Sequence, residues 1–195
     1  MTLGDAGMRA TGILIAIMAG APTLVLAQAA TAVKQMAFAR VRFAEQIAAD
    51  AEIKKAVLAK NAEGESRQTI ELRDREWSAN PTAPLRKALT TSPCANRLRE
   101  HLKTDPLVVE AILMDDKGAN VCVSRETSDY WQGDEDKWQK TFVEGKAPFV
   151  DEPAFDASSA TYAIQLSVPV SDGGRRIGAL TLTLKVRKDA AAAGR

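Results

Sequence analysis

Aromatic and charged side chains gather between residues 125 and 162, and this stretch is where the sequence could best hold a small ligand. It carries seven of the chain's ten aromatic residues. Aromatic walls supply apolar contact area, while a few charged groups among them fix the orientation of a ligand. An arginine can clamp a carboxylate through two hydrogen bonds, and an aspartate can accept hydrogen bonds from an amine. The predicted ligand-binding residues are Arg125, Asp129, Tyr130, Trp131, Trp138, Asp151 and Tyr162. The alternative is that these aromatics only fill one face of a sheet.

Other kinds of chemistry find little support among the residues. The chain has one histidine, His101, and it lies at no readable spacing from a catalytic or metal-binding partner. The serine-hydrolase motif G-x-S-x-G is absent from the sequence, and the acids around residue 134 do not follow the spacing of an EF-hand calcium loop. We therefore predict no enzymatic activity, no metal site and no cofactor, with a hydrolase as the least favoured alternative.

The balance of charges argues against nucleic acid as a partner. Lysine and arginine number 26 and aspartate and glutamate 25, which gives a formal net charge of +1. A nucleic-acid-binding protein needs a surplus of basic residues to face the phosphates. Apolar residues make up 46% and charged residues 26%, so the composition is that of an ordinary globular domain.

The first residues have the pattern of an export signal. Residues 12–27 form an uncharged apolar run that follows Arg9, the only basic residue before it. A spanning helix needs about 20 apolar residues, and Gly20 and Pro22 interrupt this shorter run. We expect residues 1–27 to be a cleaved signal peptide, which predicts a periplasmic or secreted protein. The alternative is an uncleaved membrane anchor formed by residues 12–27.

Export also bears on the two cysteines of the chain. Cys94 and Cys122 would lie in an oxidising compartment, where two thiols tend to pair. We predict a disulfide between them. The alternative is two buried thiols that pack as small apolar side chains.

The first half of the chain is predicted to be mainly helical, and these helices must help to position the candidate side chains. Residues 31–61 carry apolar residues at helical spacing and predict one long helix that ends near Gly64. Part of its apolar stripe could face a second copy of the chain. Residues 66–77 predict another helix, and the proline-rich residues 79–93 predict an irregular connection. Ser92 followed by Pro93 predicts the start of a third helix.

From residue 107 the apolar pattern changes to that of strands. The predicted strands are 107–114, 119–124, 147–151, 161–170 and 175–186, with a short helix at 134–144. This order predicts an α+β domain with an antiparallel sheet of about five strands, a long N-terminal helix on one face and short helices on the faces. The domain would cover residues 28–187, and the small and polar residues 188–195 would form a flexible tail.

Three motifs in this order resemble extracytoplasmic Cache sensor domains of the PDC, PAS-like type. The first is the turn Asp115-Asp116-Lys117-Gly118 between two strands, and the second is the segment TSDYWQGDEDKW that leads into a short helix. The third is a late hairpin with Pro169, Val170, Gly174, Ile177, Gly178 and Leu180. The resemblance covers about residues 31–187.

The resemblance implies a small organic ligand, which would be a carboxylate, an amino acid or an amine, bound between the sheet and residues 125–162. In such domains, ligand binding shifts the long helices of a dimer. The family's amino-acid-binding motif is not matched residue by residue, so the ligand class stays open. The sequence contains no recognisable second membrane segment or output module, so we expect a sensor domain that forms a homodimer or passes its state to a membrane signalling partner. The alternative is a structural or interaction module that holds a periplasmic or membrane partner protein and no small ligand.

Overall fold

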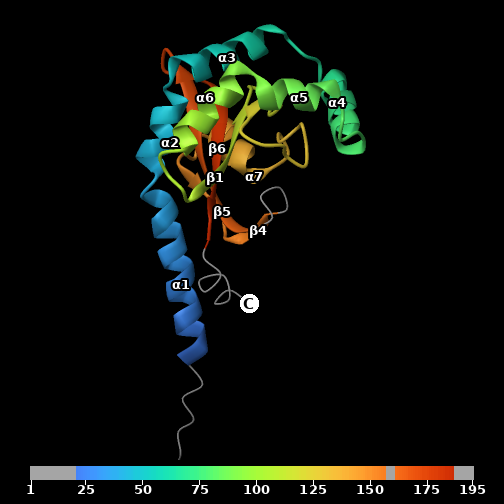
Figure 1. Ribbon diagram of the computed structural model, residues 1–195. Coiled ribbons are helices and arrows are strands. Elements are labelled where there is room, and N and C mark those ends of the chain that lie inside the picture. Colours follow the sequence, from blue (N-terminus) through green and yellow to red (C-terminus); the bar gives the residue numbers. More distant parts are fainter. Residues whose placement is uncertain (1–20, 157–160, 187–195) are drawn as a thin grey trace, which may run out of the picture.

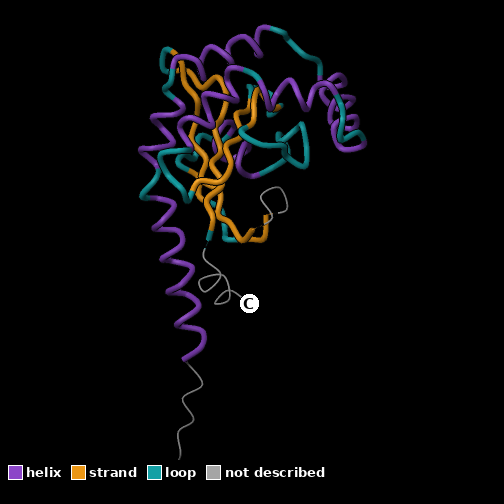
Figure 2. Tube along the Cα trace, viewed as in Figure 1, coloured by secondary structure: helices purple, strands orange, loops and turns teal. Residues whose placement is uncertain are grey.

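One antiparallel sheet with helices on both faces forms the part of the chain that the structure describes. The computed structural model describes residues 21–156 and 161–186. Five of its six strands follow the order β2-β1-β6-β5-β3, and the sixth, β4, pairs with β5 beside β3. Figure 2 shows the strands at the centre of the body and the helices around them. This arrangement confirms the predicted α+β class, with one more short strand than the five that were predicted.

The N-terminal helical segment is broken into three helices, so the prediction of one long helix is wrong. The three helices are α1 (Ala21–Phe38), α2 (Val41–Ala48) and α3 (Ala51–Ala62). The second break falls at Asp50, whose side chain accepts hydrogen bonds from the backbone N–H groups of Glu52 and Ile53 and so starts a new helix. The predicted end is confirmed, because α3 stops just before Gly64, whose φ is +63°. Figure 1 shows the segment bending over the sheet at these breaks, while α1 extends away from the body.

Three further helices follow α3 in the chain. They are α4 (Arg67–Ala79), α5 (Pro84–Thr91) and α6 (Pro93–Leu102). Ser66 caps α4 and Ser92 caps α6, where its hydroxyl accepts a hydrogen bond from the Ala95 N–H, so the predicted start at Ser92 is confirmed. The prediction of an irregular connection before Ser92 is wrong, because α5 lies within it. Pro84 occupies the first turn of α5, where a missing N–H costs nothing.

The two predicted hairpins form the centre of the sheet. Their strands are β1 (Val108–Met114), β2 (Asn120–Val123), β5 (Thr161–Asp172) and β6 (Arg175–Lys185). The hairpins meet where β1 pairs with β6, with Leu113 opposite Leu180. Their side chains alternate between a face that packs on α2, α3 and α6 and a second face.

A bulge in β2 alters this alternation at the edge of the sheet. Leu113 lies opposite Cys122 and Met114 opposite Asn120, so Val121 is an extra residue with no partner in β1. Both Val121 and Cys122 therefore join the core beneath the helices, while Val123 joins the second face.

The first part of the segment between the hairpins covers the second face, and its later part pairs with β5 at the edge of the sheet. The segment contains α7 (Asp136–Trp138), the π-helix η1 (Gln139–Val143), β3 (Phe149–Val150) and β4 (Ala154–Asp156). Both α7 and η1 contact β5, and η1 also contacts β6. The predicted short helix and the predicted strand near residue 149 are confirmed in place, whereas the π-helical form of η1 and the strand β4 were not predicted.

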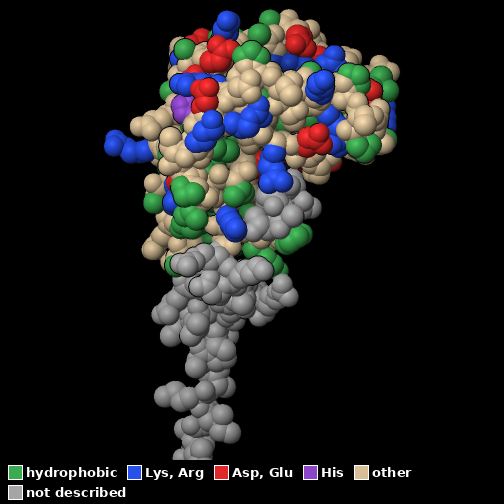
Figure 3. Space-filling view, in the orientation of Figure 1, with side chains coloured by type: hydrophobic (Ala, Val, Ile, Leu, Met, Phe, Trp, Pro, Cys, Tyr) green, Lys and Arg blue, Asp and Glu red, His purple; other side chains and the backbone are tan. Residues whose placement is uncertain are grey.

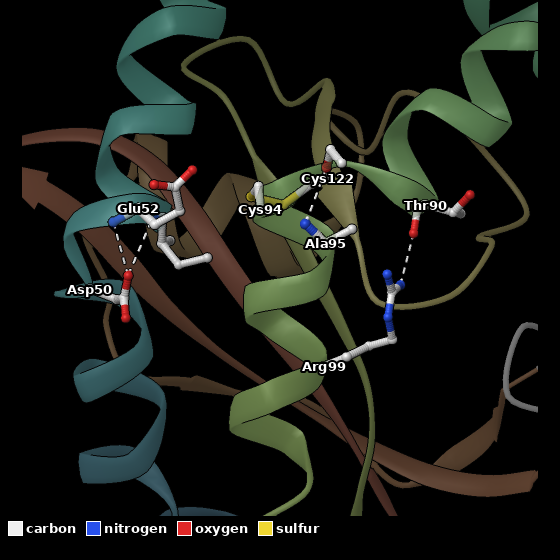
Figure 4. The surroundings of a disulfide bond; sticks show 9 residues. Asp50, Glu52, Thr90, Cys94, Ala95, Arg99 and Cys122 are labelled. Atoms are coloured by element: carbon white, nitrogen blue, oxygen red, sulfur yellow. Dashed lines mark hydrogen bonds between the residues drawn. A yellow bond between two sulfur atoms is a disulfide. The ribbon is translucent and has the colours of Figure 1, made fainter.

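The predicted disulfide is present between Cys94 and Cys122. It ties the first turn of α6 to the edge strand β2, as Figure 4 shows. On the same helix the Arg99 guanidinium donates hydrogen bonds to the carbonyls of Thr90 and Ser124, so α6 is fixed to α5 and to the end of β2.

Parts of the predicted ends lie outside the described residues. These are residues 1–20 of the expected signal peptide and the expected tail 188–195. The expected cleavage point after residue 27 falls within α1. Among the described residues, no helix combines the length and the apolar character that crossing a bilayer requires.

Candidate ligand-binding site

The second face of the sheet is covered by the segment that the sequence singled out, and we call it the covered face. On β1 the side chains of Ala111 and Leu113 pack beneath the helices, so Glu110, Ile112 and Met114 point to the covered face. The same alternation sends Ala179, Thr181 and Thr183 of β6 and Gln165 and Ser167 of β5 to this face. The face divides into an apolar half and a polar half.

The apolar half holds the covering segment in place. Ile112, Met114, Val123 and Ala179 pack with Trp138, and Phe142 stacks on that ring with 5.1 Å between centroids. The Trp138 indole N–H donates a 3.0 Å hydrogen bond to the carbonyl of Asp115, in the turn of the first hairpin. Trp138 is therefore an anchor of the cover, with its one polar atom already bound.

The polar half is a row of fully buried polar side chains. Ser167, Thr181, Thr183 and Glu110 each have 0% exposure. The hydroxyls of Ser167 and Thr181 are 2.8 Å apart, and the Thr183 hydroxyl donates a 2.9 Å hydrogen bond to Glu110 Oε2. Gln165, half-buried, lies opposite Thr183 in the register. Buried polar atoms cost free energy unless they are hydrogen-bonded, so such a row is unusual in a sheet that merely packs against a cover.

The π-helix above the sheet carries one more buried polar side chain. Thr141 has 0% exposure, and its hydroxyl has no hydrogen-bond partner among the residues that the structure describes. Short π-helical turns are rare and occur frequently at functional sites. The covered face therefore carries a carboxyl group, three hydroxyls and an amide on the sheet, and η1 adds the Thr141 hydroxyl.

Two of the predicted aromatic residues are structural anchors in a separate place. Trp131 donates its indole N–H to the carbonyl of Lys117 at 2.8 Å, and the Arg67 guanidinium lies over its ring at 3.7 Å. The backbone N–H groups of Tyr130 and Trp131 both donate to Asp74 of α4. Tyr130 is fully buried in a small cluster with residues of α4. These rings lock the start of the covering segment to α4 and to the first hairpin.

The Tyr130 hydroxyl belongs to a charged network at the end of α3. It donates a 2.9 Å hydrogen bond to Glu65, which also accepts from Lys60 at 2.7 Å and pairs with Arg73. Burial would raise the pKa of Glu65, but the hydrogen bonds from Lys60 and Tyr130 hold it below its ordinary value. Burial likewise opposes ionisation of Lys60, yet Glu63 and Glu65 raise its pKa. Glu65 is therefore ionised and Lys60 protonated at neutral pH.

The other four predicted site residues lie at different places. Arg125 is exposed and lines a shallow hollow of about 560 Å³ beside the end of α6. The carboxylate of Asp129 accepts from Ser128, and Tyr162 packs on the helix side of the sheet. Asp151 lies beside the strand that carries part of the polar half, because its N–H donates a 3.0 Å hydrogen bond to the carbonyl of Gln165. The seven residues thus do not surround one hollow in the described structure.

The polar half of the covered face was missed at the sequence level, although a signal was present. The run T-L-T-L places Thr181 and Thr183 in alternation with leucines. Such alternation ordinarily indicates a solvated face. Only the position of the covering segment shows that these threonines are buried. Among the described residues, no group of acids, cysteines and histidines could hold a metal ion.

Comparisons with known proteins give structural neighbours only: no family model and no curated protein matches the chain. The ligand-binding domain of the Campylobacter jejuni chemoreceptor Tlp3, in complex with 4-methylisoleucine, has a TM-score of 0.49 and 13% identity over 88% of this chain and 60% of that one. The sensor domain of the V. cholerae histidine kinase DctB has a TM-score of 0.45 and 12% identity, over 89% and 57%. The ligand-binding domain of the Pseudomonas aeruginosa chemoreceptor PctB, with L-Arg, has 0.45 and 11%, over 89% and 59%.

These neighbours are sensor domains of chemoreceptors and of a histidine kinase, the class that the sequence motifs resemble. This chain spans about three fifths of their length. The likeness concerns the fold alone, so it assigns no ligand to this chain.

Proposed function

We propose that this protein is an extracytoplasmic sensor module that binds a small polar organic ligand at the polar half of the covered face. The observation that carries the proposal is the row of Glu110, Ser167, Thr181 and Thr183, all with 0% exposure beneath a separate covering segment. A cover that served packing alone would be matched by apolar side chains, because those need no hydrogen-bond partners.

The chemistry of the row favours a ligand that donates hydrogen bonds. A bound ammonium group would favour the ionised form of a buried carboxyl group, whose oxygens then only accept hydrogen bonds, whereas hydroxyls both donate and accept. Glu110 would therefore select for an ammonium group, and Ser167, Thr181 and Thr141 would bind a carboxylate or hydroxyl of the same molecule. Among the ligand classes that the sequence suggested, this favours an amino acid or an amine over a simple carboxylate.

Export and signalling complete the proposal. The apolar run at residues 12–27 supports export, and the disulfide suits an oxidising compartment such as the periplasm. Helices α1 and α2 contact β5, the strand that carries Gln165 and Ser167. A change at the covered face would reach α1 along this path, and from there a second copy of the chain or a membrane partner.

One observation favours the alternative of an interaction module without a small ligand. The indole nitrogens of Trp131 and Trp138 are both bound to backbone carbonyls, so neither ring offers a polar atom to a ligand. In that case the fold would hold a partner protein, and the covered face would stay closed.

A thermal-shift screen of the full-length gene product, in the form in which it accumulates, separates the two functions. We expect an amino acid or amine to raise the melting temperature, because a ligand at 100 times its Kd adds about 2.7 kcal/mol of stability. Thr183→Val should remove most of that rise. Thr91→Val, on the exposed face of α5, is the matched control and should keep it. A flat screen against amino acids, amines and organic acids would favour the interaction module instead.

A further inference from the structure

A second hollow lies on the helix side of the sheet, away from the covered face. It has a volume of about 450 Å³ and lies between α3 and α5, with Val121 and Cys94 among its lining. The bulge in β2 brings Val121 to this side, next to the disulfide. Volumes of about 300–1,000 Å³ are usual for small-molecule sites.

Most of the lining of this hollow is apolar and small. Ala56 and Ala59 line it from α3, and Leu85, Ala88 and Leu89 line it from α5. Alanine side chains leave space between the two helices that larger residues would fill. The hollow thus fits a compact apolar group.

One end of the hollow is charged. Lys60, Glu63 and Arg73 line it there, and Glu65 lies behind them. The Lys60 ammonium already binds both acids, at 2.8 Å to Glu63 and 2.7 Å to Glu65. Arg73 differs, because its side chain is 37% exposed, contacts the two acids through Nη1 and has the Tyr130 hydroxyl as its other partner. A guanidinium has five N–H donors, so donors remain for a ligand in the hollow.

Two other polar residues line the hollow away from this end. Glu52 lies two turns before Lys60 on α3, about 12 Å along the helix axis at 1.5 Å per residue. The Ser92 hydroxyl oxygen accepts a hydrogen bond from the Ala95 N–H. The cation with available donors and the apolar surface therefore lie side by side at the Arg73 end.

We propose that this hollow is a second binding site, which takes a small monocarboxylate with an apolar body. The carboxylate would accept hydrogen bonds from Arg73, and the apolar body would lie against the alanines and leucines of α3 and α5. A charged fork matches a carboxylate in geometry as well as in charge. The proposal does not depend on the site at the covered face.

Isothermal titration calorimetry of the full-length product with hexanoate tests the proposal. Matched probes are 1-hexanol, which keeps the apolar body without the charge, and hexylamine, which reverses the charge. We expect hexanoate to bind at least tenfold more tightly than either. Equal binding of hexanoate and 1-hexanol would overturn the role of Arg73, and no binding of hexanoate would overturn the site.

Variants locate the bound hexanoate. Ala59→Leu fills the hollow and should abolish binding, while Ala62→Leu, an exposed residue of the same helix outside the lining, should leave it unchanged. Arg73→Gln should weaken binding at least tenfold, and Arg73→Lys should recover only part of it, because lysine lacks the planar fork. Unchanged binding in Ala59→Leu, with circular dichroism showing a folded protein, would place the hexanoate elsewhere and contradict the proposal.

Discussion

Glu65 joins three segments of the chain at one carboxylate. Its side chain is 6% exposed and meets Lys60 at the end of α3, Arg73 on α4 and the hydroxyl of Tyr130 in the covering segment. A carboxylate with several donors around it is stable in its ionised form even when buried. One side chain therefore holds α4 and the start of the cover against the end of α3.

Replacement of Glu65 should make stability depend less on pH. Glu65→Gln leaves Lys60 and Arg73 without their shared carboxylate, which should lower the free energy of unfolding by about 3 kcal/mol. Because the folded state lowers the pKa of Glu65, its contribution is full above its ordinary value of 4.5 and is lost as the pH falls through the lower folded value. Urea unfolding of both proteins should therefore show a difference at neutral pH that shrinks in acid.

The exposed ion pair between Arg67 and Glu71 on α4 supplies the control for this prediction. Glu71→Gln should change the free energy of unfolding by less than about 1 kcal/mol at any pH, because exposed pairs contribute little. A loss in Glu65→Gln that is equally large in acid would contradict the role given to the Glu65 carboxylate.

Single residues were predicted from the sequence where a local rule applies. Ser92 as a helix cap and the pairing of Cys94 with Cys122 are such cases, since each depends on residue type and compartment. No local rule predicts the polar half of the covered face, because the pattern around Ser167, Thr181 and Thr183 is typical of a solvated strand face. Only the position of the cover shows that these side chains are buried. Six of the seven predicted site residues were drawn from the segment between the hairpins and Tyr162 from β5, whereas the polar row lies on the sheet beneath the cover.

The first hairpin shows how an element can depend on a glycine. Gly118 has a φ of +79°, and a Cβ there would overlap the Cα of Gly133 and lie 3.2 Å from the Trp138 ring. Gly174, in the second hairpin, has nearly the same φ of +78° with nothing within 4 Å. The two positions therefore share backbone strain but differ in packing.

This pair of glycines gives a prediction about the cover. Gly174→Ala should lower the free energy of unfolding by about 1 kcal/mol, because alanine is strained in a left-handed conformation. Gly118→Ala should cost about 3 kcal/mol or more, because the added methyl group also forces the cover away from the turn. Chemical denaturation measures both. Equal costs would show that the contact between Gly118 and Gly133 does not hold the cover.

The disulfide joins two elements of the fold covalently. It closes a loop across 28 residues between α6 and β2. Replacing both Cys94 and Cys122 with alanine should lower the free energy of unfolding by about 3–4 kcal/mol in the chain-entropy account. The wild-type protein unfolded in the presence of a reductant should match the variant. Unchanged stability in both would mean that the bond adds nothing to the folded state.

Most elements could be predicted because their patterns are local, and the failures have physical causes. The apolar stripe runs on across Asp50, so periodicity alone did not reveal that its side chain caps a new helix. Helix α5 was hidden by Pro84, which breaks helices in their middle but suits their first turn. The π-helical form of η1 could not be predicted, because a segment of five residues is too short to show a distinct apolar periodicity.

The sheet separates two surfaces that could bind ligands. The covered face, with its buried polar row, lies on one side, and the hollow between α3 and α5 lies on the other. Figure 3 shows basic and acidic side chains intermixed over the helical end of the molecule in that view. Such mixing agrees with the even charge balance of the sequence, from which we predicted no nucleic-acid partner.

The most direct test of the central claim is hydrogen exchange, measured by mass spectrometry, with and without the compound that gives the largest thermal shift. A ligand at the covered face should slow exchange in η1 and in the stretches of β5 and β6 that contain Ser167, Thr181 and Thr183. Exchange in α5 should stay the same. Slower exchange confined to α3 and α5, or none in β5, β6 and η1, would contradict a ligand site on the covered face.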